Sequence, residues 1–330
     1  MKKLQKLVIL DWATMDATPG ELSWDALRAL ADEIEVYPLT KPEETVSRIG
    51  DADGVICNKV LITREVLEAC PNVKYIGILA TGFNNVDLEA ASERGIPVCN
   101  AGSYSTDAVA QLVFAYILDY CERVSLYTMG TRLGEWEQSP TFSYFPHPTT
   151  ELRGKTLGII GYGHIGRRVA EIASVFGMQV LIHTRTQPQS CPYPVVSLEE
   201  LLRQSDFVTL HCPLTADTAE LINGRTLALM KETAVLINTS RGGTVNENDL
   251  AAALNQDMLA AAYVDVLNRE PMSPETPLKA AKNCFITPHI GWTPHETRAR
   301  LVNITVNNLR GWLLGDPQHV VNHIPEAPMD

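Results

Sequence analysis

Short runs of aliphatic and β-branched residues alternate with helical stretches along almost the whole chain, and this alternation constrains the fold most. Strands separated by helices indicate βαβ units, in which parallel strands form a sheet with helices on its faces. Amphipathic stretches such as Ser23–Ala31, where Ser23 can cap, supply the expected helices. The sequence therefore predicts an α/β fold with doubly wound parallel sheets. In chain order, the expected strands are Lys6–Leu10, Ile34–Pro38, Gly54–Cys57, Lys74–Leu79, Ile96–Cys99, Thr156–Ile160, Gln179–His183, Phe207–His211, Ala234–Asn238, Ala261–Asp265 and Cys284–Thr287.

A long helical stretch, Ser105–Arg132, divides these strands into two groups, each of which can form one Rossmann-like lobe. A chain of 330 residues is long enough for two domains. The sequence does not decide which lobe the final helical stretch, Pro294–Leu314, joins. We assign residues 1–104 and 293–330 to a flavodoxin-like substrate domain, into which residues 105–292 are inserted as a dinucleotide-binding domain.

Charge and cysteine content exclude several classes of protein. The chain has 27 Lys and Arg against 39 Asp and Glu, a net charge of −12, which argues against nucleic acids and anionic membranes as partners. No apolar stretch approaches a membrane span, and the short run Leu7–Leu10 is a first strand rather than a signal peptide. We therefore expect a cytoplasmic protein. The seven cysteines are widely spaced and lack a CxxC motif, so we expect reduced core residues and no metal site.

A Gly-X-Gly-X-X-Gly motif spans residues 161–166, between an expected strand and an expected helix. In this context the motif predicts a dinucleotide site. Gly161 permits the tight turn, Gly163 lets the backbone approach a pyrophosphate, and Gly166 lets helix and strand pack closely. The pyrophosphate would bind the free N–H groups at the helix N-terminus.

The strand Gln179–His183 is followed by Thr184 and Arg185, where an NAD site usually has an acidic residue on the ribose. No carboxylate occurs between Glu171 and Glu199. An acidic residue would repel a 2′-phosphate, whereas Arg185 could pair with one. The cofactor is therefore expected to be NAD or NADP, with NADP favoured. Alternatively, Arg185 is a solvated loop charge and Thr184 holds the ribose.

Arg241, Glu270 and His289 follow the glycine motif in that order, in Asn-Thr-Ser-Arg-Gly-Gly (238–243), Asn-Arg-Glu-Pro (268–271) and Thr-Pro-His-Ile-Gly-Trp (287–292). The planar guanidinium of Arg241 can grip a carboxylate in a bidentate manner. His289 can be the general acid for reduction and the base for oxidation. Glu270 would accept a hydrogen bond from the imidazole and raise its pKa, because a negative neighbour favours the imidazolium. Each residue alone has a structural alternative (an ion pair, a helix-start carboxylate, a surface histidine), but their common order favours hydride transfer to an α-keto acid.

These motifs resemble those of the D-isomer-specific 2-hydroxyacid dehydrogenases over almost the full length of the chain. Ala80-Thr81-Gly82 and the loop at Trp136–Phe145 resemble the glycerate dehydrogenase/hydroxypyruvate reductase branch in particular. The matching stretches are Leu79-Ala-Thr-Gly-Phe-Asn-Asn-Val-Asp87, the Gly161 loop, His211-Cys-Pro-Leu214, Asn238-Thr-Ser-Arg-Gly-Gly243, Val264-Asp-Val266, Glu270-Pro271 and Pro288-His-Ile-Gly-Trp292.

The resemblance implies a set of contacts. The substrate carboxylate would bind Arg241 and the backbone N–H groups of Ala80, Thr81 and Gly82, with His289 at the carbonyl. Asp265 would lie near the nicotinamide carboxamide, unless it is a simple cap. The implied cofactor contacts are Gly161, Gly163, His164, Ile165, Gly166, Thr184, Arg185, His211, Cys212, Pro213, Thr218, Thr239, Ser240, Arg241, Asp265, His289 and Gly291.

The resemblance also implies an activity and an assembly. We expect NAD(P)H-dependent reduction of hydroxypyruvate or glyoxylate to D-glycerate or glycolate by a homodimer. Lactate-type, phosphoglycerate and phosphite dehydrogenases are alternatives, whereas formate dehydrogenases have an amide where Glu270 stands. A more remote alternative is a dinucleotide-sensing corepressor, which uses the same fold without catalysis. Five aromatic residues could wall the substrate pocket or cover a lobe or subunit interface: Trp136, Phe142, Tyr144, Phe145 and Trp292.

Overall fold

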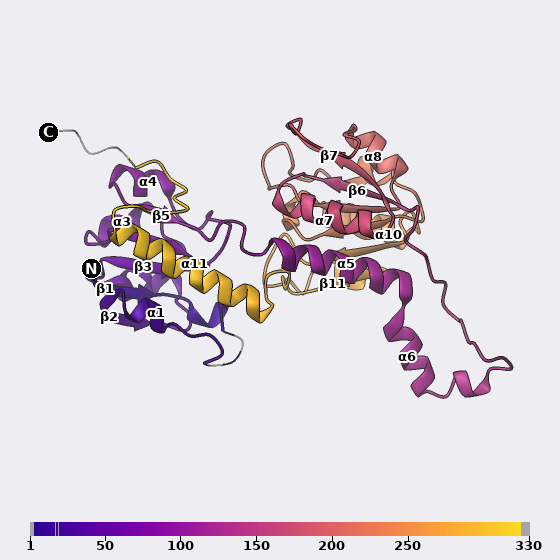
Figure 1. Ribbon diagram of the computed structural model, residues 1–330, viewed down its shortest axis with the longest axis horizontal. Coiled ribbons are helices and arrows are strands. Elements are labelled where there is room, and N and C mark those ends of the chain that lie inside the picture. Colours follow the sequence, from indigo (N-terminus) through magenta and orange to yellow (C-terminus); the bar gives the residue numbers. More distant parts are fainter. Residues whose placement is uncertain (1–2, 17, 19, 325–330) are drawn as a thin grey trace. The chain divides into compact units, whose positions relative to one another are not determined.

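A computed structural model describes residues 3–16, 18 and 20–324, and shows helices packed on parallel sheets (Figure 1). The chain divides into two compact units. The first unit comprises the described parts of 1–104 and 293–330, and the second comprises 105–292. The α/β fold with two doubly wound lobes is therefore confirmed. Among the described residues, no helix has both the length and the apolar character needed to cross a bilayer.

The first unit contains a sheet of five strands in the order β2-β1-β3-β4-β5. The first strand lies between β2 and β3, as in flavodoxin-like sheets. Helix α11 packs on this sheet, where Trp312 contacts the ring of Tyr75 at 5.2 Å between centroids. Its strands are β1 (Leu4–Ile9), β2 (Ala31–Val36), β3 (Gly54–Cys57), β4 (Tyr75–Ile78) and β5 (Val98–Cys99). Its helices are α1 (Asp25–Arg28), α2 (Thr45–Ile49), α3 (Arg64–Ala69), α4 (Leu88–Glu93) and α11 (His295–Leu313), with short 3-10 turns at Trp12–Thr14 and Pro42–Glu44.

The second unit contains a sheet of six strands in the order β11-β10-β9-β8-β6-β7, all parallel to their neighbours. Side chains alternate between its two faces. Leu157 and Ile159 of β6 enter one buried cluster with α5 and α7, whereas Ile160 enters a second cluster with α8 and α10. Its strands are β6 (Thr156–Ile160), β7 (Gln179–His183), β8 (Phe207–Leu210), β9 (Val235–Asn238), β10 (Ala261–Val264) and β11 (Cys284–Ile286). Its helices are α5 (Thr106–Glu122), α6 (Val124–Arg132), α7 (His164–Val175), α8 (Leu198–Gln204), α9 (Gly224–Leu227) and α10 (Glu247–Asn255), with 3-10 turns at Trp136–Gln138, Gly242–Thr244 and Pro277–Ala280.

The helix expected over Ser23–Ala31 is wrong in its extent. Only α1 is helical there, and Trp24 rather than Ser23 is its N-cap residue. The Ser23 hydroxyl donates to the Asp25 carboxylate at 3.0 Å and accepts from Asp25 N at 3.4 Å. Ala31 already belongs to β2, where it pairs with Leu4. The demands of sheet pairing therefore override the local amphipathic pattern.

The long helical stretch Ser105–Arg132 is likewise two helices rather than one. Arg123 adopts a left-handed backbone conformation with φ 53°, which ends α5 and turns the chain into α6. Its guanidinium lies 4.4 Å from the ring centroid of Tyr120, a cation–π contact that favours this turn. After the turn, α6 and the loop that follows it run away from the sheet (Figure 1). We refer to residues 124–150 as the arm.

Candidate active site

The parallel strands of the second unit all end at one edge of the sheet, and the predicted cofactor and catalytic residues follow those ends. In open α/β sheets, ligands bind at this edge, near the point where the strand order reverses. Here the order reverses at β6, which lies between β7 and β8. The strands lead to the glycine loop (β6), Thr184 and Arg185 (β7), His211 to Pro213 (β8), Thr239 to Arg241 (β9), Asp265 and Glu270 (β10), and His289 (β11).

Each of the three glycines in the loop at 161–166 is explained by a different feature of its surroundings. Gly161 has φ +98°, and a Cβ there would lie 2.6 Å from the backbone of His211. A Cβ on Gly166 would lie 2.1 Å from the carbonyl oxygen of Gly161. A Cβ on Gly163 would meet no atom within 4 Å, so this glycine borders open space. The loop is thus tight on its protein side and open at Gly163, which fits a cradle for a pyrophosphate.

Helix α7 begins directly after Gly163 with no side chain capping it among the described residues. The first backbone hydrogen bond at this end runs from Arg167 N to Gly163 O, at 3.0 Å. The N–H groups of His164, Ile165 and Gly166 precede that bond and have no carbonyl partner within the helix. Together with the helix dipole, they make this end suitable for an anion.

Two polar atoms beside the glycine loop are buried without a hydrogen-bond partner among the described residues: His211 Nδ1 and Thr239 Oγ1. His211 Nε2 lies 3.0 Å from the Thr209 hydroxyl, and burial lowers the pKa of the imidazole to about 3, so this ring is neutral. Buried polar atoms in native proteins usually have a partner. Both atoms belong to segments predicted to line the cofactor, so these segments fit a bound dinucleotide.

Other predicted cofactor residues have internal partners. The Thr218 hydroxyl donates to Pro213 O at 2.6 Å and accepts from Thr215 N at 2.8 Å, so it closes its own turn. Cys212 is buried, and burial raises the pKa of its thiol.

Arg185 is exposed and forms no ion pair with any described residue. Its contact with a cofactor therefore stays a prediction.

The turn that carries Arg241 is fixed by its own side chains. Asn238 donates to Arg241 O at 3.0 Å and accepts from Ser240 N at 3.0 Å. A Cβ on Gly242 would lie 1.9 Å from the backbone carbonyl carbon of Leu267, so only glycine fits this contact. The Arg241 side chain donates to Ser240 O at 2.7 Å and remains exposed. A fixed backbone therefore presents an exposed guanidinium.

Glu270 and His289 are in direct contact. Imidazole Nδ1 lies 2.7 Å from Glu270 Oε2, and Glu270 Oε1 accepts from Leu267 N at 3.0 Å. The two side chains are 37% and 32% exposed, so solvent and a ligand can reach the pair. A carboxylate at Nδ1 selects the tautomer with a proton there. Nε2 has no partner among the described residues, and its role in proton transfer stays a prediction.

Asp265 has a role that sequence reasoning missed. Its buried carboxylate accepts from the Thr287 hydroxyl at 2.6 Å, from Ile290 N at 2.7 Å and from Gly291 N at 2.8 Å. The bonds fall on both sides of His289, whose own N–H donates to Asp265 O at 2.9 Å. Asp265 therefore fixes the loop that carries the imidazole. Contact with a nicotinamide carboxamide stays a prediction, as does any cofactor contact of Gly291.

The predicted substrate residues Ala80, Thr81 and Gly82 belong to the first unit and follow β4. Ala80 O accepts from Ala101 N at 2.9 Å, and Thr81 O accepts from the Asn100 amide at 2.8 Å. The N–H groups of residues 80–82 donate to no acceptor among the described residues. This arrangement suits an anion, because the carbonyls of Ala80 and Thr81 are engaged while the three N–H donors are free.

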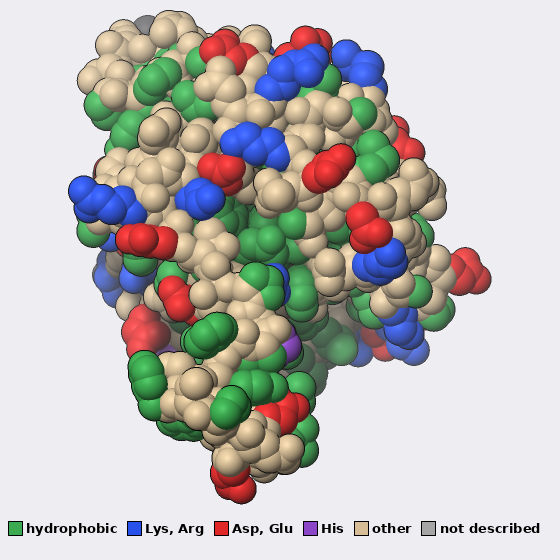
Figure 2. Space-filling model, turned by 90° about the vertical axis from the view of Figure 1, so that its right-hand side faces the viewer, with side chains coloured by type: hydrophobic (Ala, Val, Ile, Leu, Met, Phe, Trp, Pro, Cys, Tyr) green, Lys and Arg blue, Asp and Glu red, His purple; other side chains and the backbone are tan. Residues whose placement is uncertain are grey.

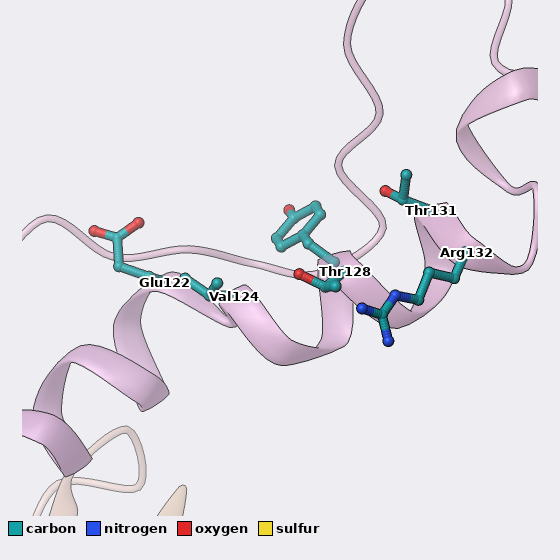
Figure 3. Close-up of a pocket in the computed structure, with 6 residues that line it drawn as sticks. Glu122, Val124, Thr128, Thr131 and Arg132 are labelled. Atoms are coloured by element: carbon teal, nitrogen blue, oxygen red, sulfur yellow. The ribbon is translucent and has the colours of Figure 1, made fainter.

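A surface hollow at the start of the arm contains none of these residues. Its volume is about 480 Å³, and Figure 3 shows its walls on and beside α6. Among the described residues, no three His, Cys, Asp or Glu side chains are grouped to bind a metal ion. All seven cysteines are free thiols. The lining residues of the hollow are Glu122, Val124, Tyr127, Thr128, Thr131 and Arg132.

Comparison with known proteins agrees with this geometry. Residues 114–291 match the model of the D-isomer specific 2-hydroxyacid dehydrogenase, NAD binding domain. The chain is 45% identical to a hydroxypyruvate reductase of Blautia hydrogenotrophica over 325 residues, which cover 96% of this chain and 99% of that protein. It is 37% identical to a glycerate dehydrogenase of Methylorubrum extorquens, over 96% of this chain and 99% of that protein.

A solved structure shares this fold over nearly the whole chain. The crystal structure of the TT0316 protein from Thermus thermophilus matches with a TM-score of 0.84 and 38% sequence identity. The match covers 96% of this chain and 99% of that one. Because the family model spans more than half of the chain and the relatives span nearly all of it, the resemblance noted from the motifs is confirmed. The chain belongs to the D-isomer-specific 2-hydroxyacid dehydrogenase family, as an oxidoreductase that acts on CH–OH groups with a nicotinamide dinucleotide.

Proposed function

We propose that the protein reduces hydroxypyruvate or glyoxylate to D-glycerate or glycolate, with NADPH preferred to NADH. The observation that carries this proposal is the contact of 2.7 Å between Glu270 and His289, on the sheet edge that also bears Arg241 and the glycine loop. The relatives named as a hydroxypyruvate reductase and a glycerate dehydrogenase support this substrate class.

Three side chains have distinct tasks in this proposal. Arg241 holds the substrate carboxylate through its exposed guanidinium. His289 gives the proton at Nε2 to the carbonyl oxygen as the alcohol forms. Glu270 holds the ring at Nδ1, so that Nε2 faces the reacting oxygen. The bound nicotinamide supplies the hydride for reduction.

The proposed preference for NADPH rests on the loop after β7. The exposed Arg185 is free of an ion pair among the described residues, and no carboxylate lies near it in sequence. Replacing Arg185 with Ser is expected to raise the KM for NADPH about tenfold or more, since a charge-assisted hydrogen bond is lost. The KM for NADH should change less than about twofold. An equal loss for both cofactors, or none for either, would contradict the role of Arg185.

We also infer that the active protein is a homodimer in which the arm contacts a second copy. The arm is held in shape by bonds such as Tyr127 OH to His147 O at 2.8 Å, yet its outer face is apolar. Leu133, Phe142 and Phe145 are 71%, 91% and 77% exposed. Figure 2 shows hydrophobic side chains along the lower edge of the view, where the arm stands. Monomeric proteins rarely expose so large an apolar patch, which favours an interface over a pocket wall for these aromatic residues.

The assembly is tested by light scattering of the wild type and of a Phe142→Ser/Phe145→Ser variant. Twice the mass of the chain for the wild type and a shift toward one copy for the variant support the dimer. A monomeric wild type would overturn it.

The activity is tested by following oxidation of NADPH and NADH with hydroxypyruvate, glyoxylate and pyruvate. Rapid turnover with hydroxypyruvate or glyoxylate supports the proposal. Preference for pyruvate would point to a lactate-type enzyme. Tight dinucleotide binding without turnover of any keto acid would move the assignment to another substrate or to the corepressor alternative.

A further inference from the structure

A chain of buried amides lies behind residues 80–82 in the first unit. Asn100 is 8% exposed, and its side chain donates to Thr81 O at 2.8 Å while accepting from Gly102 N at 3.1 Å. The Thr81 hydroxyl donates to Gly102 O at 2.5 Å. Residue 100 therefore joins the loop after β4 to the loop after β5.

The chain continues into the C-terminal helix. Asn308 of α11 is 2% exposed and donates to Asn100 O at 2.8 Å. Its side-chain oxygen accepts from His319 Nδ1 at 2.8 Å, and Asn100 N donates back to His319 O at 3.1 Å. The segment at Asn100 is thus held by α11 and by the tail beyond it, in addition to the sheet.

These bonds engage carbonyl oxygens of the loop at residues 80–82 and leave its N–H groups free. The carbonyl of Ala80 accepts from Ala101 N and that of Thr81 accepts from the Asn100 amide, whereas no described group accepts from the N–H donors of residues 80–82. A peptide plane whose oxygen is fixed on one side presents its N–H on the other. Since both asparagines are buried, a lost bond cannot be replaced freely by solvent.

We propose that Asn100 and Asn308 are positioning residues for the substrate carboxylate. They orient the two peptide planes that carry the N–H groups of Thr81 and Gly82, so that these groups form a fixed nest for an anion. Neither side chain has to touch the substrate, so the expected effect is on substrate affinity rather than on the chemical step. This inference rests on the proposed function of residues 80–82.

The test uses substitutions that preserve shape. Asn100→Asp keeps the acceptor for Gly102 N but replaces the donor to Thr81 O with a repelling oxygen. Asn308→Asp likewise keeps the acceptor for His319 and loses the donor to Asn100 O. Each variant is expected to raise the KM for hydroxypyruvate about tenfold, with kcat changed less than about threefold. The Kd for NADPH should not change, because the glycine loop belongs to the other unit.

Asn322 provides a matched control in the same unit. Its amide donates to Ile96 O at 2.9 Å and accepts from Val98 N at 2.9 Å, without contact with residues 80–82. Asn322→Asp should leave the KM within about twofold of the wild type. A rise equal to that of Asn100→Asp would mean that the effect is general destabilisation, and an unchanged KM in both Asn100→Asp and Asn308→Asp would overturn the inference.

Binding of oxalate separates this inference from the proposed reaction. Calorimetry with oxalate and the dinucleotide-loaded protein needs no turnover. A wild type that binds oxalate but reduces no keto acid would refute the proposed activity alone. If Asn100→Asp and Asn308→Asp then bind oxalate as tightly as the wild type, the positioning role is refuted as well. If Asn100→Asp does not fold, Asn308→Asp alone decides: weaker oxalate binding supports the positioning role, and unchanged binding refutes it.

Discussion

His211 and His289 follow strands of the same sheet but have opposite surroundings. His211 follows β8, its Nδ1 is enclosed without a partner among the described residues, and burial lowers the pKa of the ring to about 3. His289 follows β11, is 32% exposed at its side chain, and has Glu270 at 2.7 Å. An imidazole can serve as general acid only where it can carry a proton and reach the substrate. A ring with its Nδ1 enclosed can line a site, whereas a half-exposed, carboxylate-bound ring can perform proton transfer.

The largest expected effect is that of removing the exposed ring. His289→Asn should lower kcat with hydroxypyruvate by about 10²- to 10⁴-fold, the usual contribution of a general acid. Steady-state kinetics measure this loss. His295 is a matched control, because it also contacts a glutamate, Glu21 at 3.2 Å, but lies in the other unit. If His295→Asn loses as much activity as His289→Asn, the special role of His289 is wrong.

The next effect concerns the carboxylate that distinguishes the two rings. Glu270→Gln can keep the acceptor for Leu267 N but removes the negative charge beside Nδ1. By analogy with partners that orient metal-bound histidines, kcat should fall about 10- to 100-fold, less than in His289→Asn. The double variant should be no slower than His289→Asn alone, because the two residues act as a unit. Additive losses in the double variant would show that Glu270 acts independently of the ring.

A smaller loss of activity is expected from the loop that supports His289. Asp265→Asn replaces one carboxylate oxygen with a donor, although the chain offers three donors to this side chain: Thr287 Oγ1, Ile290 N and Gly291 N. The free energy of unfolding should fall by about 1–3 kcal/mol, the usual cost of an unsatisfied buried group. The kcat should fall about tenfold, as the ring loses its fixed position. Urea unfolding and steady-state kinetics give both values, and unchanged values would contradict the clamp.

The smallest effect concerns His211 and is a change in the free energy of unfolding with pH. The pKa of His211 is about 3 in the folded protein against 6.5 for the free side chain, so the unfolded state binds the proton first. Its neutral form therefore stabilises the fold fully above pH 6.5, and that stability is lost as the pH falls toward 3. The loss is at most about 1.4 kcal/mol per pH unit for one group.

Urea unfolding of the wild type and of His211→Gln across this range checks the pH effect. Gln does not titrate, so the variant should lose less stability than the wild type over the same fall in pH. Parallel curves would mean that His211 is accessible to protons in the folded state.

Much of the fold could be predicted, because its signal is local. Every expected strand overlaps an observed one, since short apolar runs between helices have few other solutions in a parallel sheet. The helix breaks were not predictable in the same way. Neither break is marked by a glycine or proline. At Arg123 a left-handed backbone accompanies the ring contact with Tyr120, and after α1 residue 31 pairs with Leu4 in the sheet, a distant contact that local helix propensity does not encode.

In the candidate site, too, residues with a local sequence signal could be proposed, whereas residues that act through distant contacts could not. Arg241, Glu270 and His289 could be proposed from the sequence because their chemistry is rare in combination and each follows a strand, and their catalytic roles stay predictions. The clamp by Asp265 and the amides Asn100 and Asn308 were not identified. Their partners lie far away in the chain, up to 208 residues for the bond between Asn308 and Asn100, and only the packing of α11 on the first sheet brings that pair together. A lone Asn or Asp in a sequence carries no sign of such a bond.

The most direct test of the proposed proton transfer is a single-turnover experiment. Protein in excess over NADPH is mixed with saturating hydroxypyruvate, and oxidation of the dinucleotide is followed for the wild type and His289→Asn. This measurement isolates the chemical step from product release. If His289 gives the proton, the wild-type rate should be about 10²- to 10⁴-fold above that of the variant. Equal single-turnover rates would contradict it, because the proton would then come from a group other than His289.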